Sequence, residues 1–455
     1  MTRNQLLSTL LTAVFLSGCA EAPIKLGDGT VERPLQRVTG ISTGDVEKAS
    51  QKSELNLWDV YAVAVDRTER LASKVEDNEQ ADAQSQQAIG AVLPHVSLAG
   101  SKNYVSGNSI GSGSFTTGSN IAGASLYLTG TQTLITGLTE VAGVAGAQAN
   151  SDFQKHNLRN ESSRFLLDLA RAFYSVLETK ETIESKRTSK DLTEKTLAQL
   201  KNWQAVGRSR VSEVLSAQAQ VARLTADIQD AENQLAQAQE GLASLSGIQP
   251  GQKLKAEESY AAPSFSLAQA ETKADARPDV KAAEASVGIA DAYLLQAHGL
   301  HLPSLSVQGN YYLLKEGGAA PEWNVQLLAS LPIFQGGQAL AQERLMGSRK
   351  RQAEMQLSQA RRTAREEIRQ AYQSLVNSIQ SVDAYQRALD AAEADYQAVA
   401  KDYRLNLTTN LEVLQTLNTL QDTKTHYSQA KYQALVDQVW LGVATGELPK
   451  TGETK

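Results

Sequence analysis

The sequence is poor in the residues that build compact, cross-linked domains. A single cysteine among 455 residues excludes a disulfide framework. Aromatic residues make up only 5%, and residues 139–205 and 338–404 contain no proline. A net charge of −6, without any run of basic residues, argues against a nucleic-acid partner. The abundant residues are Ala, Gln, Ser, Leu and Glu, a composition typical of long and largely solvated helices.

Residue patterns that carry chemistry are also missing. The five histidines are scattered, and no nucleophile is accompanied by a recognisable base. His298 and His301 have a spacing seen in metal sites, but Gly299 and Pro303 are expected to disrupt the helix that would align them. We therefore expect no catalytic activity, no cofactor and no metal site.

The N-terminus has the features of a secretory signal. Arg3 precedes an apolar stretch, Leu6 to Leu16, that is too short to span a bilayer as a helix. The tetrad Leu16-Ser17-Gly18-Cys19 resembles a bacterial lipobox, in which the cysteine becomes the acylated first residue. We predict a signal peptide over residues 1–18 and a lipidated, mostly extended tether over 19–55. The alternative is an ordinary signal peptide with an incidental cysteine.

The strongest positive feature is an internal repeat with an offset of 199 residues. The offset brings Gly137 onto Gly336, Gly247 onto Gly446, and the tripeptide Glu213-Val214-Leu215 onto Glu412-Val413-Leu414. Such a long register indicates two duplicated halves, and the heptad spacing of apolar residues predicts coiled-coil pairing. The heptads run through Leu169, Val176, Ile183 and Val214, Val221, Ile228, Leu235, Leu242 in one half, and through Ile368, Leu375, Val382, Leu389 and Val413, Leu420, Leu441 in the other.

Each half is predicted to hold a helix, a β-hairpin and two long helices. After residue 20, no stretch approaches the length of a transmembrane helix. Period-2 alternation, clearest from Asn324 to Leu331, marks the hairpin strands. The predicted first repeat covers 56–247, with a helix at about 56–90, a hairpin at 93–136 and helices at 139–245. A linker over 248–276 leads to the second repeat over 277–446, with a hairpin at 302–335 and helices at 338–445. A tail over 447–455 follows.

Strands of about ten residues are long enough to cross a bilayer when tilted. Four such strands cannot close a barrel, and open strand edges cannot face lipid. If the hairpins lie in a membrane, the protein must therefore oligomerise. The alternative is that they are ordinary surface hairpins.

The breaks between the long and the returning helices form two tips. Gly207 aligns with Asn406, and both residue types readily adopt a left-handed backbone that reverses the chain. Thr409 and Glu412 have the spacing of a capping box, which gives Glu412 a purely structural explanation. The functional alternative is that the tips bind a partner and surround a pore entrance, where repeated carboxylates repel one another or bind cations.

The duplicated halves, Arg277-Pro278-Asp279, the segment Leu331 to Gly337 and the two tips together resemble the TolC family of outer-membrane channels, the outer-membrane factors of Gram-negative bacteria. The resemblance implies a mixed, mostly α fold and a homotrimer with a twelve-stranded β-barrel and a long periplasmic helical tunnel. It implies docking to a periplasmic adaptor (membrane fusion) protein linked to an inner-membrane transporter. The resemblance further implies passive export through this channel, in efflux or type I secretion. The alternative is a periplasmic coiled-coil scaffold lipoprotein without a pore.

The resemblance also implies site residues. Glu412 occupies the position of an acidic constriction residue, and Gln415 stands where a second acid is found in the family. Tyr403 matches a tyrosine that helps to hold the tip closed, and Glu213 is the counterpart of Glu412 in the first half. The residues that match adaptor-binding tips are Gly207, Arg208, Ser209, Arg210, Asn406, Leu407, Thr408 and Thr409.

Overall fold

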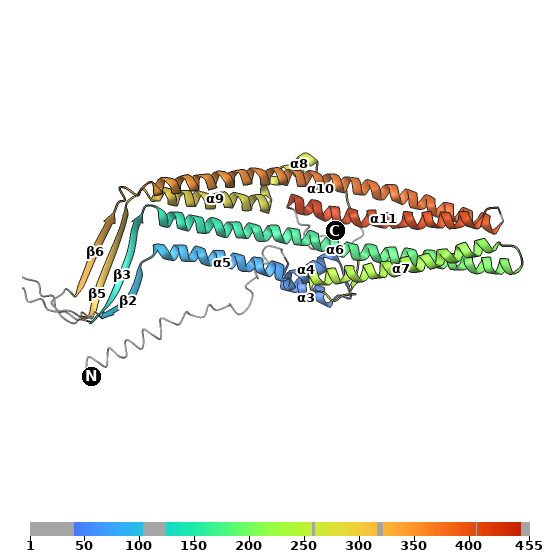
Figure 1. Cartoon of the computed structure of the whole chain (residues 1–455), viewed down its shortest axis with the longest axis horizontal. Helices are drawn as coiled ribbons and strands as arrows, with labels where there is room; N and C mark the ends of the chain where they lie inside the picture. The colour runs from blue at the N-terminus through green and yellow to red at the C-terminus, as the bar shows by residue number, and fades with distance from the viewer. Residues whose placement is uncertain (1–40, 103–123, 257–259, 316–321, 406, 447–455) are drawn as a thin grey trace, which may run out of the picture.

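The computed structural model describes residues 41–102, 124–256, 260–315, 322–405 and 407–446. The molecule is elongated, with a β-sheet at one end and two turns between antiparallel helices at the other (Figure 1). Among the described residues, no helix combines the length and the apolar character needed to cross a membrane. The expected signal peptide and Cys19, the loop at the tip of the first hairpin, Asn406 and the C-terminal tail lie outside the described residues.

Two long helices run most of the length of the molecule. They are α6 (Thr139–Ala205) and α10 (Gln338–Arg404), each of 67 residues, so each extends for about 100 Å at 1.5 Å per residue. The returning helices α7 (Val211–Ser246) and α11 (Asn410–Thr445) have 36 residues each. All four bounds repeat at an offset of 199 residues, which confirms the predicted long helices and their duplication.

Glycines end or reverse these helices where the sequence predicts them. Gly247 and Gly446 close α7 and α11 with left-handed φ angles of 69° and 71°. Gly207 has a φ of 75° in the turn between α6 and α7, so it reverses the chain as expected.

The heptad positions form the buried seams of the helical pairs. Leu169, Val176 and Ile183 of α6 are buried. The heptad positions of α10 are also buried, namely Ile368, Leu375, Val382 and Leu389. The seam is thin along most of its length because Ala and Ser alternate with the larger side chains. A thicker core forms only near the middle of the molecule, where Phe165 and Phe173 pack under α4.

The expected single helix over 56–90 is wrong, because the chain bends at Thr68. Helix α4 (Leu57–Arg67) ends there and α5 (Glu69–Val92) begins, with Thr68 in an extended conformation (φ −81°, ψ 125°). The run Val60 to Val65 is buried on every side of α4. Helix α5 instead buries only one narrow face along α6. Helices α4 and α5 therefore run in different directions, α4 into the core and α5 along the surface of α6.

The predicted tether and linker are more structured than expected. Helix α3 (Thr43–Gln51) and strand β1 (Glu54–Leu55) lie within the predicted tether, and Ile41 and Leu55 enter the main core. Strand β1 pairs in parallel with β4 (Lys253–Leu254) of the linker. The linker also holds α8 (Leu267–Glu271) and a 3₁₀ turn (Ala274–Ala276), both packed on α10. These elements are too short to show a period in the sequence.

The hairpins join into one antiparallel sheet in the order β2-β3-β5-β6. Its strands are β2 (His95–Lys102), β3 (Ala124–Thr136), β5 (Ser304–Lys315) and β6 (Trp323–Ser330). In the described residues no strand pairs with the outer edge of β2 or of β6. The predicted second hairpin extends to residue 335, but β6 stops at Ser330.

The sheet has one apolar face and one polar face. Leu98, Leu128, Tyr311 and Trp323 stand opposite one another across all four strands. Thr131, Gln308 and Gln326 are aligned in the same way, three residues away along each strand, and this odd separation places them on the other face. The period-2 prediction is therefore confirmed.

The helices continue the lateral order of the strands. Near the sheet, the neighbours are α5, α6, α9 (Pro278–Gly299) and α10; near the tips, they are α7, α6, α11 and α10. Figure 1 shows α9 and α11 following one another along the same line, as do α5 and α7. Both the sheet end and the tip end of the molecule are thus a single layer of four neighbouring elements, and α3, α4 and α8 add to this layer only near the middle.

An arginine closes each junction between successive helices. Arg277 donates from Nη1 to the Ala444 carbonyl oxygen (3.3 Å) and is buried against Asp279 and Glu367, at 2.8 and 2.6 Å. In the first repeat, Arg67 donates to the Gly247 carbonyl oxygen at 2.8 Å, but its side chain is exposed. Both satisfy carbonyl groups at a helix C-terminus, where positive charge is favoured.

We predict that Arg277→Ala lowers the stability of the fold by about 2–3 kcal/mol, because it leaves two carboxylates without their shared partner. Arg67→Ala is the matched control, and should cost about 1 kcal/mol, the value of one hydrogen bond. Thermal unfolding followed by circular dichroism measures both. Equal effects of the two substitutions would contradict this account of the junction.

Candidate functional site

The first tip is fastened by Glu213. Its Oε2 accepts hydrogen bonds from Ser209 Oγ at 2.6 Å and from the Arg210 backbone N–H at 3.2 Å. The carboxylate therefore caps the start of α7, where the helix dipole also favours negative charge. Its partial burial leaves it less available to ions than an open carboxylate.

The second tip is built differently. Thr409 Oγ1 accepts from the Glu412 backbone N–H at 3.4 Å, which is one half of the predicted capping box. Within the described residues, the Glu412 carboxylate has no hydrogen bond or ion pair, and the side chain is exposed. Gln415 is also exposed, one turn further along α11. The capping role predicted for Glu412 is thus performed by its counterpart Glu213, and Glu412 is available to solvent.

Tyr403 lies between the two helical pairs. Its ring packs on Trp203 of α6 with 5.5 Å between the ring centroids. Burial, together with the negative charge of Glu213, raises the pKa of Tyr403 to about 12, so the hydroxyl is neutral at physiological pH. An open cleft of about 860 Å³ between α6 and α10 begins beside this ring. Tyr403 and Glu213 are brought together, whereas Glu412 and Gln415 lie exposed on α11.

Trp203 was missed by the sequence analysis. It has no counterpart in the repeat, because the position 199 residues later is Asp402. The one available signal was a large aromatic residue close to the predicted turn in a chain with few aromatics.

The expected adaptor-binding residues form an accessible surface. Gly207, Arg208, Arg210, Leu407 and Thr409 are exposed, and Ser209 and Thr408 are partly buried. Large apolar side chains surround them and are also exposed, namely Val206, Val211, Leu405 and Leu411. Exposed apolar side chains clustered with polar ones are typical of a surface that contacts another protein.

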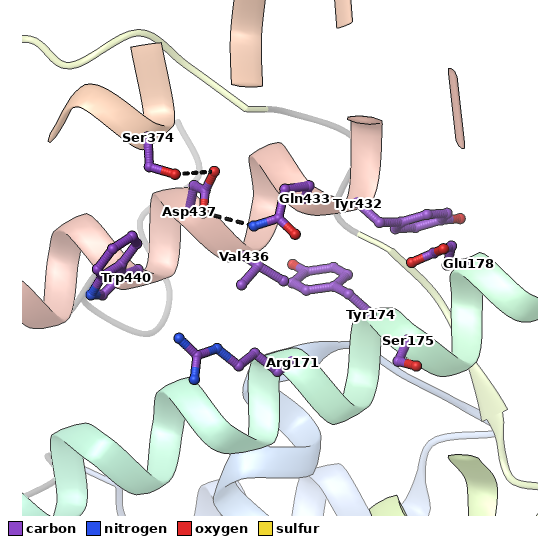
Figure 2. A pocket seen from close by; sticks show the side chains of 10 residues that line it. All are labelled: Arg171, Tyr174, Ser175, Glu178, Ser374, Tyr432, Gln433, Val436, Asp437 and Trp440. Carbon is purple, nitrogen blue, oxygen red and sulfur yellow. Dashed lines mark hydrogen bonds between the residues drawn. The ribbon is translucent and has the colours of Figure 1, made fainter. Parts of the chain in front are cut away.

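A buried carboxylate joins the two long helices of the second repeat near the middle of the molecule. Asp437 of α11 is 2% exposed and accepts hydrogen bonds from Ser374 Oγ (2.9 Å), Gln433 Nε2 (2.9 Å) and Ser378 Oγ. Figure 2 shows the pocket beside it, of about 240 Å³, with Arg171 of α6 extending toward it from the opposite side. The charge is satisfied by neutral donors, so the network ties α10 to α11.

This network ends a polar stripe that begins at the tip. Glu412, Gln415, His426, Gln433 and Asp437 recur at helical spacing along one side of α11. His426 stacks on Tyr385 of α10, with 5.6 Å between the ring centroids. The apolar core residues of α11 lie on another side of the helix. The stripe gives the second repeat a hydrophilic surface from the tip to the middle of the molecule.

The histidine pair is closer to a carboxylate than the sequence indicates. Helix α9 ends at Gly299, between the two histidines, as the sequence predicts. His298 and His301 nevertheless each lie 3.5 Å from a carboxylate oxygen of Glu343. No group of three such side chains in the described ranges is arranged to hold a metal ion.

We predict that Glu213→Ala and Glu412→Ala have different effects on tip structure. Removing Glu213 deletes a helix cap and costs about 1 kcal/mol, so amide hydrogen exchange at residues 210–214 should accelerate roughly fivefold. Glu412→Ala, the matched variant, should leave exchange at residues 409–413 unchanged. Equal acceleration at both tips would show that Glu412 is also a structural cap.

The chain is similar to known proteins over most of its length. Residues 271–447 match the family described as outer membrane efflux protein. Outer membrane protein TolC of Escherichia coli is 24% identical over 437 residues, which cover 92% of this chain and 87% of TolC. The matching family is described by efflux and not by a reaction, in agreement with the expectation that this chain is not an enzyme.

Solved structures share the fold. The outer membrane protein VceC of Vibrio cholerae superposes with a TM-score of 0.78 at 17% identity, covering 87% of this chain and 97% of VceC. The CmeC outer membrane channel of Campylobacter jejuni gives a TM-score of 0.76 at 15% identity, covering 95% of this chain and 96% of CmeC. Residues 271–447 thus match the outer membrane efflux protein family, and the chain as a whole shares the fold of these outer membrane channels.

Proposed function

We propose that the chain is one subunit of a homotrimeric exit duct in the outer membrane of a Gram-negative cell. The duct receives cargo from a periplasmic adaptor and an inner-membrane transporter, in efflux or type I secretion, and passes it outward without chemistry of its own. The observation that carries this proposal is the lateral order of the strands and of the long helices, which leaves two free lateral edges in the described part of the chain.

The free edges belong to the same elements along the whole molecule. One edge consists of β2, α5 and α7, and the other of β6 and α10. Joining unlike edges of successive copies gives a closed ring, because a head-to-tail contact closes when the rotation between copies divides the circle. Three copies of four strands make the twelve-stranded barrel implied by the family resemblance.

The sheet is suited to a membrane. Its strands have 8 to 13 residues, close to the 9–11 that cross a bilayer when tilted. The apolar face is suited to lipid, and Tyr311 and Trp323 stand side by side near one end of the strands, as interfacial aromatic residues do. The polar face is suited to a water-filled lumen.

The tips are the proposed contact with the adaptor and the proposed gate. Residues 207–210 and 407–409, with Asn406 outside the described residues, present the exposed surface that an adaptor hairpin requires. Tyr403 holds the two helical pairs together at the closed end by packing on Trp203, and Glu213 fastens the first tip. Glu412 supplies a ring of three carboxylates, while Gln415 adds no charge to it.

A scaffold lipoprotein without a pore is the competing function. It shares the lipid anchor and the coiled coils but requires no passage for ions. Ion conductance therefore separates the two hypotheses.

We predict discrete single-channel openings when the purified protein is inserted into planar bilayers. Glu412→Ala should weaken block by divalent cations at the tip side, because three solvent-exposed carboxylates are removed. Glu412→Gln controls for the loss of side-chain volume and should act in the same way. Membranes that stay non-conducting at high protein concentration would favour the scaffold instead.

We also predict that Cys19 carries the lipid anchor. Cys19→Ala should abolish incorporation of labelled palmitate, because the acylated sulfur is lost. Cys19→Ser, which keeps a small polar side chain at the cleavage site, is the control and should behave identically. Continued labelling of either variant would refute the lipobox assignment.

A further inference from the structure

The two repeats match over their whole length once two offsets are used. After the hairpin tips the offset is 199 residues, as for Gly137 and Gly336. Before the tips it is 209 residues, which brings Leu93-Pro94 onto Leu302-Pro303 and Gly90 onto Gly299. The difference is the longer loop between β2 and β3. Every residue of β6 therefore has a counterpart in β3, and every residue of β2 has a counterpart in β5, inside the same subunit.

The contact between the repeats inside one subunit is known in detail. Strand β3 pairs with β5, with Gly130 opposite Gly309 and Thr129 opposite Asn310. Just below the sheet, Gly137 and Gly299 approach so closely that neither has room for a side chain. The second repeat thus packs on the first in one fixed register.

The counterparts of this contact are open in the subunit. A side chain on Gly90 or on Gly336 would meet no atom within 4 Å. Strand β6 has 8 residues, whereas its counterpart β3 has 13. The missing part of β6, residues 331–335, exposes Ile333 and Phe334 by 94% and 88%.

We propose that β6 of one copy pairs with β2 of the next in the register of β3 and β5, and that Gly336 packs on Gly90 of the next copy. This inference rests on the proposed trimer and specifies its interface. The β3–β5 pairs, moved by the two offsets, put Ala329 opposite Gly100 and Leu328 opposite Ser101 of the next copy.

Side-chain chemistry supports the same register. The pair Gln132–Val307 transfers to Leu331 opposite Leu98, which are 58% and 41% exposed in the subunit. The pair Ile135–Leu305 transfers to Phe334 opposite Val96, which are 88% and 71% exposed. Four exposed apolar side chains thus become two cross-strand pairs, and aromatic with β-branched pairs are among the favourable ones. The pairing also extends the short strand β6 to the length of β3.

Disulfide formation tests the register. Leu328→Cys with Ser101→Cys and Ala329→Cys with Gly100→Cys place thiols in the predicted register, one pair on each face of the sheet. The matched controls, Leu328→Cys with Ala99→Cys and Ser330→Cys with Ser101→Cys, are shifted by two residues in either direction. Within one subunit β2 and β6 are three strand spacings, about 14 Å, apart. A disulfide needs Cα atoms within about 7 Å, so any bond must join two copies.

We expect both in-register pairs to give a heat-stable covalent trimer on non-reducing gels after mild oxidation of whole cells. The shifted pairs and the single-cysteine proteins, which control for Cys19, should remain monomeric. The mass of each protein in detergent is measured in parallel. A trimer that cross-links in a shifted register, or in none, overturns the inference but keeps the proposed function. A monomeric mass for the unmodified protein overturns both.

Discussion

The hydrogen-bonding groups along the outer edges of β2 and β6 are the constraint on which the rest of the structure depends. In lipid, an unpaired backbone N–H or C=O costs several kcal/mol. A four-stranded sheet with an apolar face and two open edges is therefore stable in a bilayer only when other strands cover those edges. The lateral order of the helices repeats the order of the strands, so in the proposed trimer the same closure joins the helices into a continuous wall.

The helices transmit the geometry of the sheet to the tips. Thin seams of Ala, Ser and Leu keep the long helices in one layer. Arginines at the helix junctions join the helices near the sheet to the helices near the tips. The duplication is not perfect at the tips. Glu213 is used to cap α7, while Glu412 stays exposed. The two tips of a subunit are therefore chemically different, so a gate built from them has threefold rather than sixfold symmetry in its charges.

Much of this fold was predictable because its largest elements have clear periods. The bounds of α6 and α10 follow from seven-residue spacing and the absence of proline, and the strands follow from alternation. The short elements α3, α8 and β4 were missed because they are held by tertiary contacts rather than by local pattern. The Trp203–Tyr403 contact was missed because it joins two repeats across a distance that no local spacing encodes. The positions of the two turns were predictable from the sequence, but the division of Glu213 and Glu412 into a cap and a free charge required the geometry.

The mass of the purified mature protein tests the central claim most directly. Multi-angle light scattering, corrected for bound detergent, should give three copies per particle at every protein concentration. Removal of detergent should cause precipitation, because the apolar face of the closed sheet is then exposed to water. A monodisperse single copy that remains in plain buffer would contradict the account.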